Sequence, residues 1–509
     1  MNPALVWVIL PECILVVAAV GIYLVGAFVE GWSRWSAAAI AAIVVAGVAL
    51  GTQSQVPAPG GGIDLGPLAW YTRWLALGIG ALLTFVAARP TGPLGTAEYA
   101  GTLLLGVAGV MLVGSANDLV LLFVGLELIS IPTYILLYLG RRDAAAQEAA
   151  AKYFYLSILS SAILLYGFSY LYGLSRSTDL AAIAAAMQDI DSLPSGFEQF
   201  ARLGLALILG GLAFKLTAVP MHFYAPDVYQ GTTQTNAALL AVVPKVAGFV
   251  AILRLTAVAM PCMAPWAWKA ALAMAVLSMT VGNFMALWQQ NIRRLMAYSS
   301  IAHTGYMLIG LTVGLATLGH ARTWDGFAAL LFYLAVYAAA TIGVFAALRY
   351  LDRGGQQIDG VDELAGLART QPATAGVLAI CLFSLAGIPP MAGFWGKLLL
   401  FGSALEVHGG PGPSVRPWLI ALAVIGGLNA AVAAAYYLRV ISVMYFRTPL
   451  ATQRGEGGPG AAFAALAAAL LVLAIGLYPG PLMRLAEQAS PAGPVAAAAL
   501  DGVVPVGRP

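Results

Sequence analysis

Long apolar runs, separated by short polar connections, occupy almost the whole chain. A helix that crosses the hydrocarbon core of a membrane needs about 20 mainly apolar residues. Predicted helices cover residues 4–28, 34–52, 72–89, 98–114, 118–139, 150–173, 201–225, 235–259, 268–288, 295–317, 326–350, 373–406, 417–446 and 460–482. Asn117 and Asp118 divide two of them, because polar residues that favour turns are unfavourable in mid-bilayer. The pattern predicts an all-α polytopic membrane protein with about 14 transmembrane helices.

The composition excludes a water-soluble fold. Hydrophobic residues make up 61% of the 509 residues and charged residues only 9%, whereas an ordinary soluble domain has about 25% charged residues. The mean hydropathy of +0.87 is that of a membrane protein. A formal net charge of +3 is too small to indicate a nucleic-acid partner. The expected surroundings are a lipid bilayer.

The sequence indicates no cofactor or metal site in this chain. Cys13, Cys262 and Cys381 lie far apart and form no C-x-x-C, which argues against an iron–sulfur cluster, a zinc site and a disulfide framework. The string from Gly455 to Gly460 fits G-x-G-x-x-G, but it follows no strand and has a proline where a helix should begin. We interpret it as a flexible loop. The isolated chain is expected to bind no nucleotide, flavin, haem or metal.

Two pairs of similar strings indicate an internal repeat. Residues 214–220 resemble residues 383–389, each with a proline inside a helical run, and residues 154–156 resemble residues 332–334. Both pairs join helices that are five apart, so the two copies must cross the membrane in opposite directions, as in transporters with inverted repeats. Chance similarity between apolar helices is the alternative. Because proline removes a backbone hydrogen bond, we predict broken helices 7 and 12 that face a polar interior.

The repeat divides the chain into four parts. Residues 1–97 hold helices 1 to 3, residues 98–259 the first repeat of helices 4 to 8, residues 260–450 the second repeat of helices 9 to 13, and residues 451–509 helix 14 and the tail. Loops after odd-numbered helices carry slightly more Lys and Arg than the opposite loops. The positive-inside rule therefore predicts periplasmic termini and a cytoplasmic loop at 351–372.

Three of the five lysines fall well inside predicted helices, namely Lys215, Lys245 and Lys397. Each costs about 2.5–3.5 kcal/mol at a helix centre on insertion scales, so an unneeded charge should be absent there. A lysine near a helix end can instead extend its amine to the membrane interface. That alternative suits Lys152 and Lys269, and it suits Lys215 less well.

Glu127 lies between apolar residues and is also expected to be desolvated. Desolvation favours the neutral forms of a carboxyl and an amine, while a close Glu and Lys favour each other's charged form. A row of such groups is a physically sensible proton relay in which Glu127 acts as an electrostatic switch. His222 and His303 are possible relay members, although His303 is as well suited to a plain interhelical hydrogen bond. For Glu12 we favour a helix-packing or subunit-contact role.

Several strings resemble those of the antiporter-like membrane subunits of respiratory complex I, and the resemblance covers roughly residues 95–450. They are Ser115–Leu119, Glu127–Pro132, Glu148–Phe154, Leu164–Gly167, Phe214–His222, Pro226–Gly231, Asn291–His303 and Gly387–Lys397. Trp395 and Ser157 depart from the pattern of that family. Neither of them matches a position of the family's proton path.

The resemblance implies a subunit of a proton-translocating NADH:quinone oxidoreductase in a bacterial inner membrane. Such a subunit performs no redox chemistry itself, and NAD, FMN, iron–sulfur clusters and quinone are expected in other subunits. Its implied partners are the other membrane subunits of the complex, the lipid bilayer and protons. In the family a helix 5 glutamate and lysines of helices 7, 8 and 12 form the proton path, and these positions match Glu127, Lys215, Lys245 and Lys397.

Two other functions remain open at this point. One is a subunit of a multisubunit sodium/proton antiporter or a membrane-bound hydrogenase, which share the fold and the lysines. The other is a structural membrane anchor whose lysines pair with glutamates of neighbouring subunits.

Overall fold

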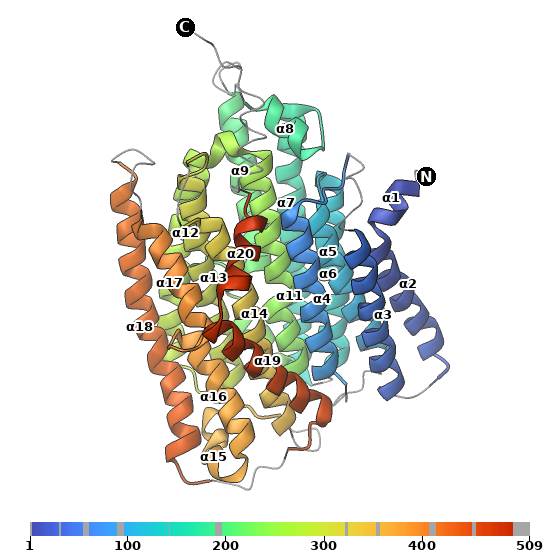
Figure 1. Cartoon of the computed structure of the whole chain (residues 1–509), viewed down its shortest axis with the longest axis vertical. Coiled ribbons are helices and arrows are strands. Elements are labelled where there is room, and N and C mark those ends of the chain that lie inside the picture. The colour runs from blue at the N-terminus through green and yellow to red at the C-terminus, as the bar shows by residue number, and fades with distance from the viewer. Residues whose placement is uncertain are drawn as a thin grey trace.

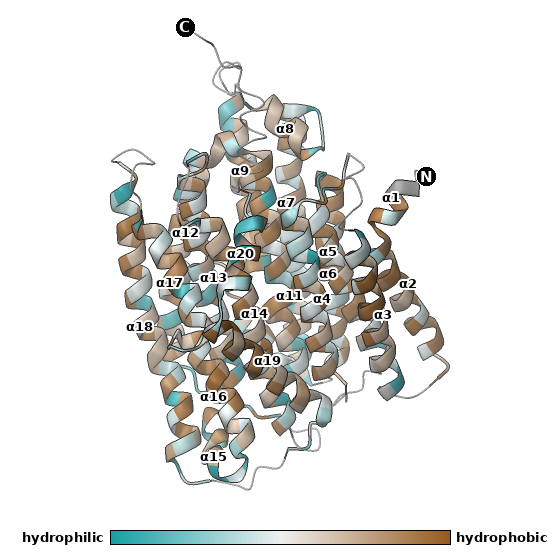
Figure 2. Ribbon diagram, in the orientation of Figure 1, coloured by the Kyte–Doolittle hydropathy of each residue, from teal (hydrophilic) through white to brown (hydrophobic). Residues whose placement is uncertain are grey.

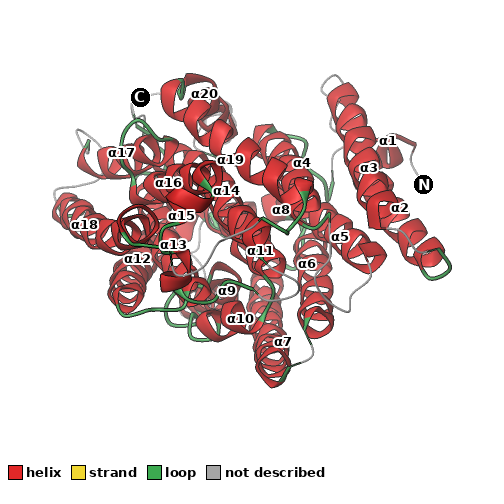
Figure 3. Cartoon of the chain, turned by 90° about the horizontal axis from the view of Figure 1, so that it is seen from below, coloured by secondary structure: helices red, strands yellow, loops and turns green. Residues whose placement is uncertain are grey.

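The protein is described by a computed structural model. It covers residues 3–29, 32–53, 61–88, 96–141, 143–188, 196–320, 324–352, 357–406, 414–449 and 455–491. Within these ranges the regular elements are helices, and the only β pairing is three isolated bridges (Figure 3). Parts of the first and last predicted segments, including residues 492–509, lie outside the described residues.

Each predicted helix overlaps a helix of the structure. In chain order the α-helices are α1 (Pro3–Val8), α2 (Leu10–Gly26), α3 (Trp32–Thr52), α4 (Pro67–Val86), α5 (Thr96–Ser115), α6 (Leu119–Gly140), α7 (Ala144–Ser175), α8 (Leu180–Ala186), α9 (Phe197–Leu216), α10 (Ala225–Gly231), α11 (Gln234–Leu253), α12 (Ala264–Leu287), α13 (Ile292–Ala316), α14 (Gly326–Leu351), α15 (Leu367–Thr370), α16 (Pro372–Ala386), α17 (Ala392–Leu405), α18 (Arg416–Phe446), α19 (Pro459–Leu477) and α20 (Gly480–Ala489). Short π and 3-10 turns are η3 (Arg254–Ala259), η4 (Pro261–Met263) and η5 (Val361–Leu364).

Most of the long helices run side by side along the long axis of the molecule (Figure 1). Eleven of the described helices are long and apolar enough to cross a membrane, judged by length and composition, and α2, α16 and α17 are shorter apolar helices. Brown, hydrophobic residues occur along these helices, most densely in α2, α3 and α19 (Figure 2). The structure is therefore that of a polytopic all-α membrane protein.

Local capping chemistry sets where several helices begin. An N-terminal side chain that accepts a hydrogen bond from a backbone N–H satisfies one of the free donors of the first turn. The side chains that do so are Asp118 in α6, Asp143 in α7, Asp179 in α8, Thr233 in α11, Asn291 in α13 and Asp325 in α14. The predicted division at Asn117 and Asp118 is thus confirmed, because α5 ends at Ser115 and Asp118 caps α6.

The two predicted helices that were expected to be broken are interrupted in the structure, whereas α6 and α11 continue through Pro132 and Pro244. Helix α9 ends at Leu216, where Thr217 adopts a left-handed conformation, and the chain continues into the short α10. Helix α16 ends at Ala386, where Gly387 has φ of +86°, and α17 follows. Glycine adopts this conformation without steric cost. Each interruption leaves main-chain carbonyls of the preceding helix end without helical partners.

Helices α11 and α14 form the centre of the bundle (Figure 3). Every residue of α11 is buried, and so is every residue of α14 except Tyr350. Helices that are buried all round inside a membrane protein contact other helices rather than lipid on every face. Polar side chains on α11 and α14 therefore face the protein interior.

A buried ion pair joins α2 to α4. Arg73 donates to both carboxylate oxygens of Glu12 at 2.7 Å, and it also donates to the carbonyl oxygen of Val8. The Gln53 side chain accepts a further hydrogen bond from Arg73 at 3.2 Å. Both charged side chains are at most 3% exposed. The contacts agree with the helix-packing role predicted for Glu12.

Candidate functional site

The first part of the site is a pair formed by Glu127 on α6 and Lys215 on α9. Their charged atoms, Oε1 and Nζ, are 3.4 Å apart. Lys215 also donates to the hydroxyl of Ser130 at 2.7 Å, and Ser161 on α7 donates to Glu127 at 2.5 Å. The Lys215 side chain is only 5% exposed, whereas that of Glu127 is 23% exposed. Glu127 and Lys215 are paired, and the Glu127 side chain is only partly buried.

Lys245 lies at the centre of the molecule on α11. Its amine donates to the carbonyl oxygen of Ser300 on α13, and to the Ser300 hydroxyl at 2.6 Å. The Ser300 hydroxyl is 2.9 Å from the hydroxyl of Tyr337 on α14, whose ring lies 5.2 Å from the Lys245 amine. Lys245 is completely buried. Hydroxyl groups can accept one proton and donate another, so they can pass protons to and from this amine.

His303 lies one turn beyond Ser300 on α13. Its Nδ1 is 2.7 Å from the hydroxyl of Tyr333, and its Nε2 is 2.9 Å from the hydroxyl of Tyr437 on α18. A neutral imidazole needs a donor at one nitrogen and an acceptor at the other, and a tyrosine hydroxyl can serve as either. Since both ring nitrogens have such partners, His303 can exchange protons on both sides.

Lys397 on α17 completes the row. Its amine donates to the carbonyl oxygens of Leu385 and Ala386 at 3.0 and 2.8 Å. These carbonyls end α16, where the helix dipole favours a positive charge. The Tyr306 ring lies 4.9 Å from the amine. A Cβ atom at Gly387 would approach the Lys397 side chain to 2.7 Å, so the glycine that ends α16 also leaves room for this lysine.

Helix α13 connects the lysines of the row. Thr304 donates to the carbonyl oxygen of Leu216, the neighbour of Lys215, at 2.6 Å, and to that of Ser300 at 3.2 Å. Helix α13 thus contacts Leu216, the neighbour of Lys215, through Thr304, Lys245 through Ser300, and Lys397 through Tyr306. The structure places the four predicted proton-path residues and His303 in one mostly buried row across the molecule.

The remaining predicted ionisable residues lie outside this row. His222 is half-buried in the interruption after α9, and within the described ranges no hydrogen bond joins its imidazole to the row. Lys152 forms ion pairs with Glu148 at 2.6 Å and with Asp227 at 2.7 Å. Lys269 is exposed beside Trp266. Lys152 is thus partly exposed and Lys269 exposed, and neither belongs to the row.

Sequence reasoning missed the neutral members of the row. Ser130 follows Glu127 by three residues, and Tyr337 follows Tyr333 by four, so each pair lies on one helical face. Polar residues at this spacing on an apolar helix were a usable signal. Tyr437 has no such signal, because its partners Ser299 and His303 are on a helix far away in sequence.

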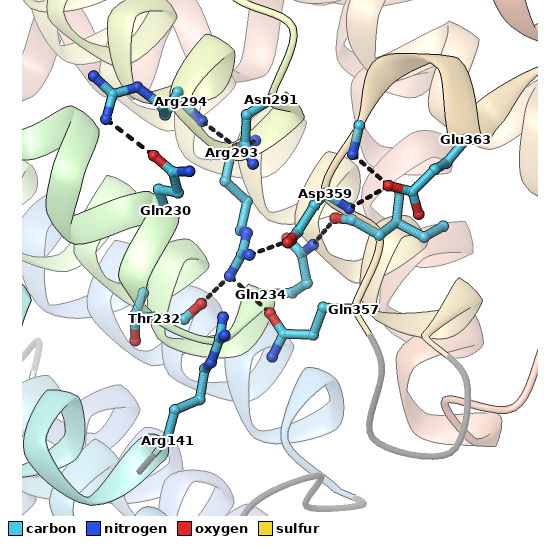
Figure 4. A network of polar contacts seen from close by, with 12 residues as sticks. Arg141, Gln230, Thr232, Gln234, Asn291, Arg293, Arg294, Gln357, Asp359 and Glu363 are labelled. Atoms are coloured by element: carbon cyan, nitrogen blue, oxygen red, sulfur yellow. Dashed lines mark hydrogen bonds and ion pairs between the residues drawn. The ribbon is translucent and has the colours of Figure 1, made fainter. Parts of the chain in front are cut away.

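A second polar network lies at the end of the bundle where α14 ends (Figure 4). Arg293 at the start of α13 donates to the carbonyl oxygen of Thr232 and to the carboxylate of Asp359, and to Gln357 at 2.8 Å. Gln234 at the start of α11 donates to the carbonyl oxygen of Ile358 at 3.0 Å. The segment from Gln357 to Asp359 is therefore held against α11 and α13. In the described part of the chain no group of three or more His, Cys, Asp and Glu residues could hold a metal ion.

Residues 116–425 match the family described as NADH:quinone oxidoreductase/Mrp antiporter, transmembrane. NADH-quinone oxidoreductase subunit N 1 of Solibacter usitatus is 39% identical over 442 residues, which are 85% of this chain and 86% of that relative. The chain belongs to this family. Subunit N of Paramagnetospirillum magneticum is 35% identical, over 95% of this chain and 96% of its own length. The resemblance seen in the sequence is confirmed.

Solved structures have the same fold. A chain of the respiratory complex I from Thermus thermophilus with bound aureothin is 31% identical, with a TM-score of 0.76 over 93% of this chain and 98% of its own. A chain of the Mrp complex from Dietzia sp. DQ12-45-1b is 22% identical, with a TM-score of 0.79 over 96% of this chain and 97% of its own. At this identity the second likeness concerns the fold alone.

Proposed function

We propose that this chain is subunit N of a proton-translocating NADH:quinone oxidoreductase in a bacterial inner membrane. The observation that carries the proposal is the mostly buried row from Glu127 through Lys215, Lys245 and His303 to Lys397. Intramembrane ionisable residues are costly, and they mark ion or proton pathways. The kind of complex is inferred from the relatives at 35–39% identity, which are named as subunits of NADH-quinone oxidoreductase.

The row carries protons by changes of charge at neighbouring groups. The carboxylate of Glu127 stabilises the ammonium form of Lys215, so a change of charge at Glu127 changes the proton affinity of Lys215. The hydroxyl of Ser300 and the imidazole of His303 pass protons between the lysines. The carbonyls that end α16 stabilise the charged form of Lys397. His222 is not joined to the row, and we assign it no step.

Redox chemistry belongs to other subunits in this proposal. NAD, FMN, iron–sulfur clusters and quinone bind there, and quinone reduction drives the protons through this chain. The partners are the other membrane subunits, both antiporter-like and small. The solved structures of similar fold are chains of respiratory complex I and of the Mrp complex, which supports such partners.

The proposed architecture has 14 transmembrane helices in two inverted five-helix repeats. Eleven candidate spans are found by length and composition. Adding α2, α13 and the interrupted pair of α16 and α17, counted as one span, gives 14. Residues 98–259 form one repeat and residues 260–450 the other, with residues 1–97 before them and 451–509 after them. The interruptions after α9 and α16 occupy corresponding positions, which supports the repeat.

The other two functions fit less well. A sodium/proton antiporter or hydrogenase subunit would share the row, but the relatives of highest identity here are named as quinone oxidoreductase subunits. A structural anchor whose lysines pair with neighbouring subunits needs lysines at the surface. Lys215, Lys245 and Lys397 find their hydrogen-bond partners within the chain.

Purification of the complex tests the function. A tagged version of the chain is expected to bring down a complete set of oxidoreductase subunits and an NADH:quinone reductase activity coupled to proton uptake in inside-out vesicles. Recovery of a complex without NADH oxidation, together with sodium/proton exchange, would assign the chain to an antiporter.

The orientation of the chain is tested by fusions. Alkaline phosphatase is active only on the periplasmic side, so it is expected to be active when fused after Leu482 and inactive when fused near Gly360. The reasons are the basic loops that follow odd-numbered helices and the even number of spans. The reverse pattern would refute this orientation, and equal activities would mean that the number of spans is wrong.

A further inference from the structure

A buried asparagine on α12 links this helix to α13 and α18. Asn283 has no exposed surface. The preceding residue, Gly282, allows a close approach of α12 to α13, since a Cβ atom there would lie 2.6 Å from the backbone nitrogen of Ala302. Tyr306 follows Ala302 by four residues and therefore lies one turn further along the same face of α13. Asn283 thus reaches the helix that carries His303 and Tyr306.

Asn283 uses both of its donors and its acceptor. Its Nδ2 donates to the hydroxyl of Tyr306 at 3.0 Å and to the Oδ1 of Asn429 on α18 at 3.1 Å. Its Oδ1 accepts a hydrogen bond from the hydroxyl of Tyr436 on α18 at 3.1 Å. A side-chain amide has two N–H donors and one acceptor oxygen, so each polar atom of Asn283 has a partner. The four side chains are at most 5% exposed.

The main chain of α18 fixes the direction of these hydrogen bonds. The Nδ2 of Asn429 donates at 3.0 Å to the carbonyl oxygen of Ile425, one turn earlier on the same helix. The Oδ1 of Asn429 is therefore left to face Asn283, which must present its own Nδ2 there. The Oδ1 of Asn283 then faces Tyr436, and the oxygen of Tyr306 is held as an acceptor.

The ring of Tyr306 faces the amine of Lys397, with 4.9 Å between the amine and the ring centre. A cation near the face of an aromatic ring is attracted by the ring electrons. The other polar contacts of the amine are two main-chain carbonyl oxygens, and in the described part of the chain no ion pair involves Lys397. The position of the Tyr306 ring therefore affects how strongly Lys397 holds its proton.

The other end of the network lies beside His303. The rings of Tyr436 and Tyr437 have centres 4.4 Å apart, and the hydroxyl of Tyr437 is 2.9 Å from the Nε2 of His303. Tyrosine is neutral at physiological pH, so these residues add no charge near Lys397 and His303. The titratable side chains that surround this region from α13, α14 and α18 are Tyr306, Tyr333, Tyr337, Tyr436 and Tyr437.

We propose that Asn283 is a positioning residue of the proton path, which holds the ring of Tyr306 against the amine of Lys397. The proposal rests on the proposed function, in which Lys397 carries protons. An amide neither takes up nor releases a proton at physiological pH, so Asn283 acts through Tyr306. Its removal changes the pH range over which Lys397 carries protons.

Replacement of Asn283 by leucine tests the proposal, because Asn283→Leu removes the three hydrogen bonds and keeps a side chain of similar size. In assembled complexes, NADH-driven proton uptake into inside-out vesicles falls at high pH, and in the variant this fall should come about 0.5–1 pH unit lower, the shift that loss of a cation–π contact produces. The ammonium form of Lys397 then lacks the ring that stabilises it. Asn236→Leu is the matched control, because Asn236 is a buried asparagine outside this network that donates to the carbonyl oxygen of Leu136. Its pH profile should not move.

Variants of Tyr306 separate positioning from a general contribution to stability. Tyr306→Leu removes the ring and should shift the pH profile at least as far as Asn283→Leu. Adding Asn283→Leu to Tyr306→Leu should cause no further shift, because the ring through which Asn283 acts is gone. Tyr306→Phe keeps the ring but removes the hydroxyl that Asn283 holds, so it should shift the profile in the same direction. It decides the matter where Asn283→Leu fails to assemble.

The outcomes distinguish this proposal from the proposed function. Uptake that falls by the same factor at every pH in Asn283→Leu would make Asn283 a structural residue and overturn the proposal, as would additive shifts in the double variant or an unchanged profile in Tyr306→Phe. Normal uptake and an unmoved profile in Asn283→Leu, with loss in Lys397→Ala, would overturn the positioning role and leave the proposed function intact. Normal uptake in an assembled Lys397→Ala complex would contradict the proposed function itself.

Discussion

Replacing Lys215 by alanine is expected to abolish proton pumping and to lower NADH-driven quinone reduction on the order of tenfold or more, as loss of a proton carrier does. The change removes the carrier itself. It also removes the positive partner 3.4 Å from Glu127, so Glu127 then favours its neutral, protonated form. Because pumping and electron transfer are mechanically coupled in such a complex, both activities fall.

Two graded variants refine this prediction. Lys215→Arg keeps the charge but should restore little activity, because a guanidinium holds its proton at any physiological pH. Glu127→Asp keeps a titratable group and should be milder than Glu127→Gln, which should resemble Lys215→Ala in direction.

The measurement is quinone reduction and proton uptake in inside-out vesicles, with assembly checked on native gels. Lys269→Ala is the matched control, since it makes the same chemical change at an exposed lysine outside the row. Normal coupled activity in an assembled Lys215→Ala complex would exclude the proton-path role and favour the anchor function.

The second large effect is expected on stability, at the pair of Glu12 and Arg73. Arg73→Met leaves the Glu12 carboxylate buried without its counter-charge, which costs about 3–5 kcal/mol. Total stabilities of about 5–15 kcal/mol make this a large fraction, so the amount of the chain in the membrane should fall strongly. Replacing both residues, Glu12→Leu with Arg73→Met, should recover much of the loss because no charge is left unpaired.

The amount of subunit in membranes and the melting temperature of the purified complex measure this effect. Arg447→Met is the control, because it breaks an ion pair whose side chains are 58% and 72% exposed, and exposed pairs contribute about 0–1 kcal/mol. If the double variant were as unstable as Arg73→Met, the loss would come from packing and not from the unpaired charge.

Helix positions were predictable because a membrane span is a local property of the sequence. About 20 apolar residues can leave water only as a helix that satisfies its own backbone. The interruptions after Leu216 and Ala386 were predicted from the repeated proline-containing strings. A proline alone does not determine a break, because α6 and α11 continue through Pro132 and Pro244. The short α8, α10 and α15 were missed because helices of four to seven residues show too little periodicity to be recognised.

Within the candidate site, only the charged residues inside apolar helices could be predicted from the sequence. Lys215, Lys245 and Lys397 were recognisable because a charge placed among apolar residues needs a reason to be there. Their partners were not, since Ser130, Ser300 and Tyr437 are ordinary residues of membrane helices. In the sequence, Asp352 is one of several charged residues in a connecting loop. Only the structure shows that its side chain is buried, at 1% exposure.

The sequence by itself determined the fold class, the location of the spans, the broken helices and the charged members of the row. The tertiary structure alone decided which groups meet: Glu12 with Arg73, His303 with Tyr437, and the face of α11 with that of α14. The physical reason is the separation in sequence over which each effect acts. Hydropathy and proline act on their own segment of chain, whereas burial and hydrogen bonding depend on helices that are distant in sequence and come together only when the bundle packs.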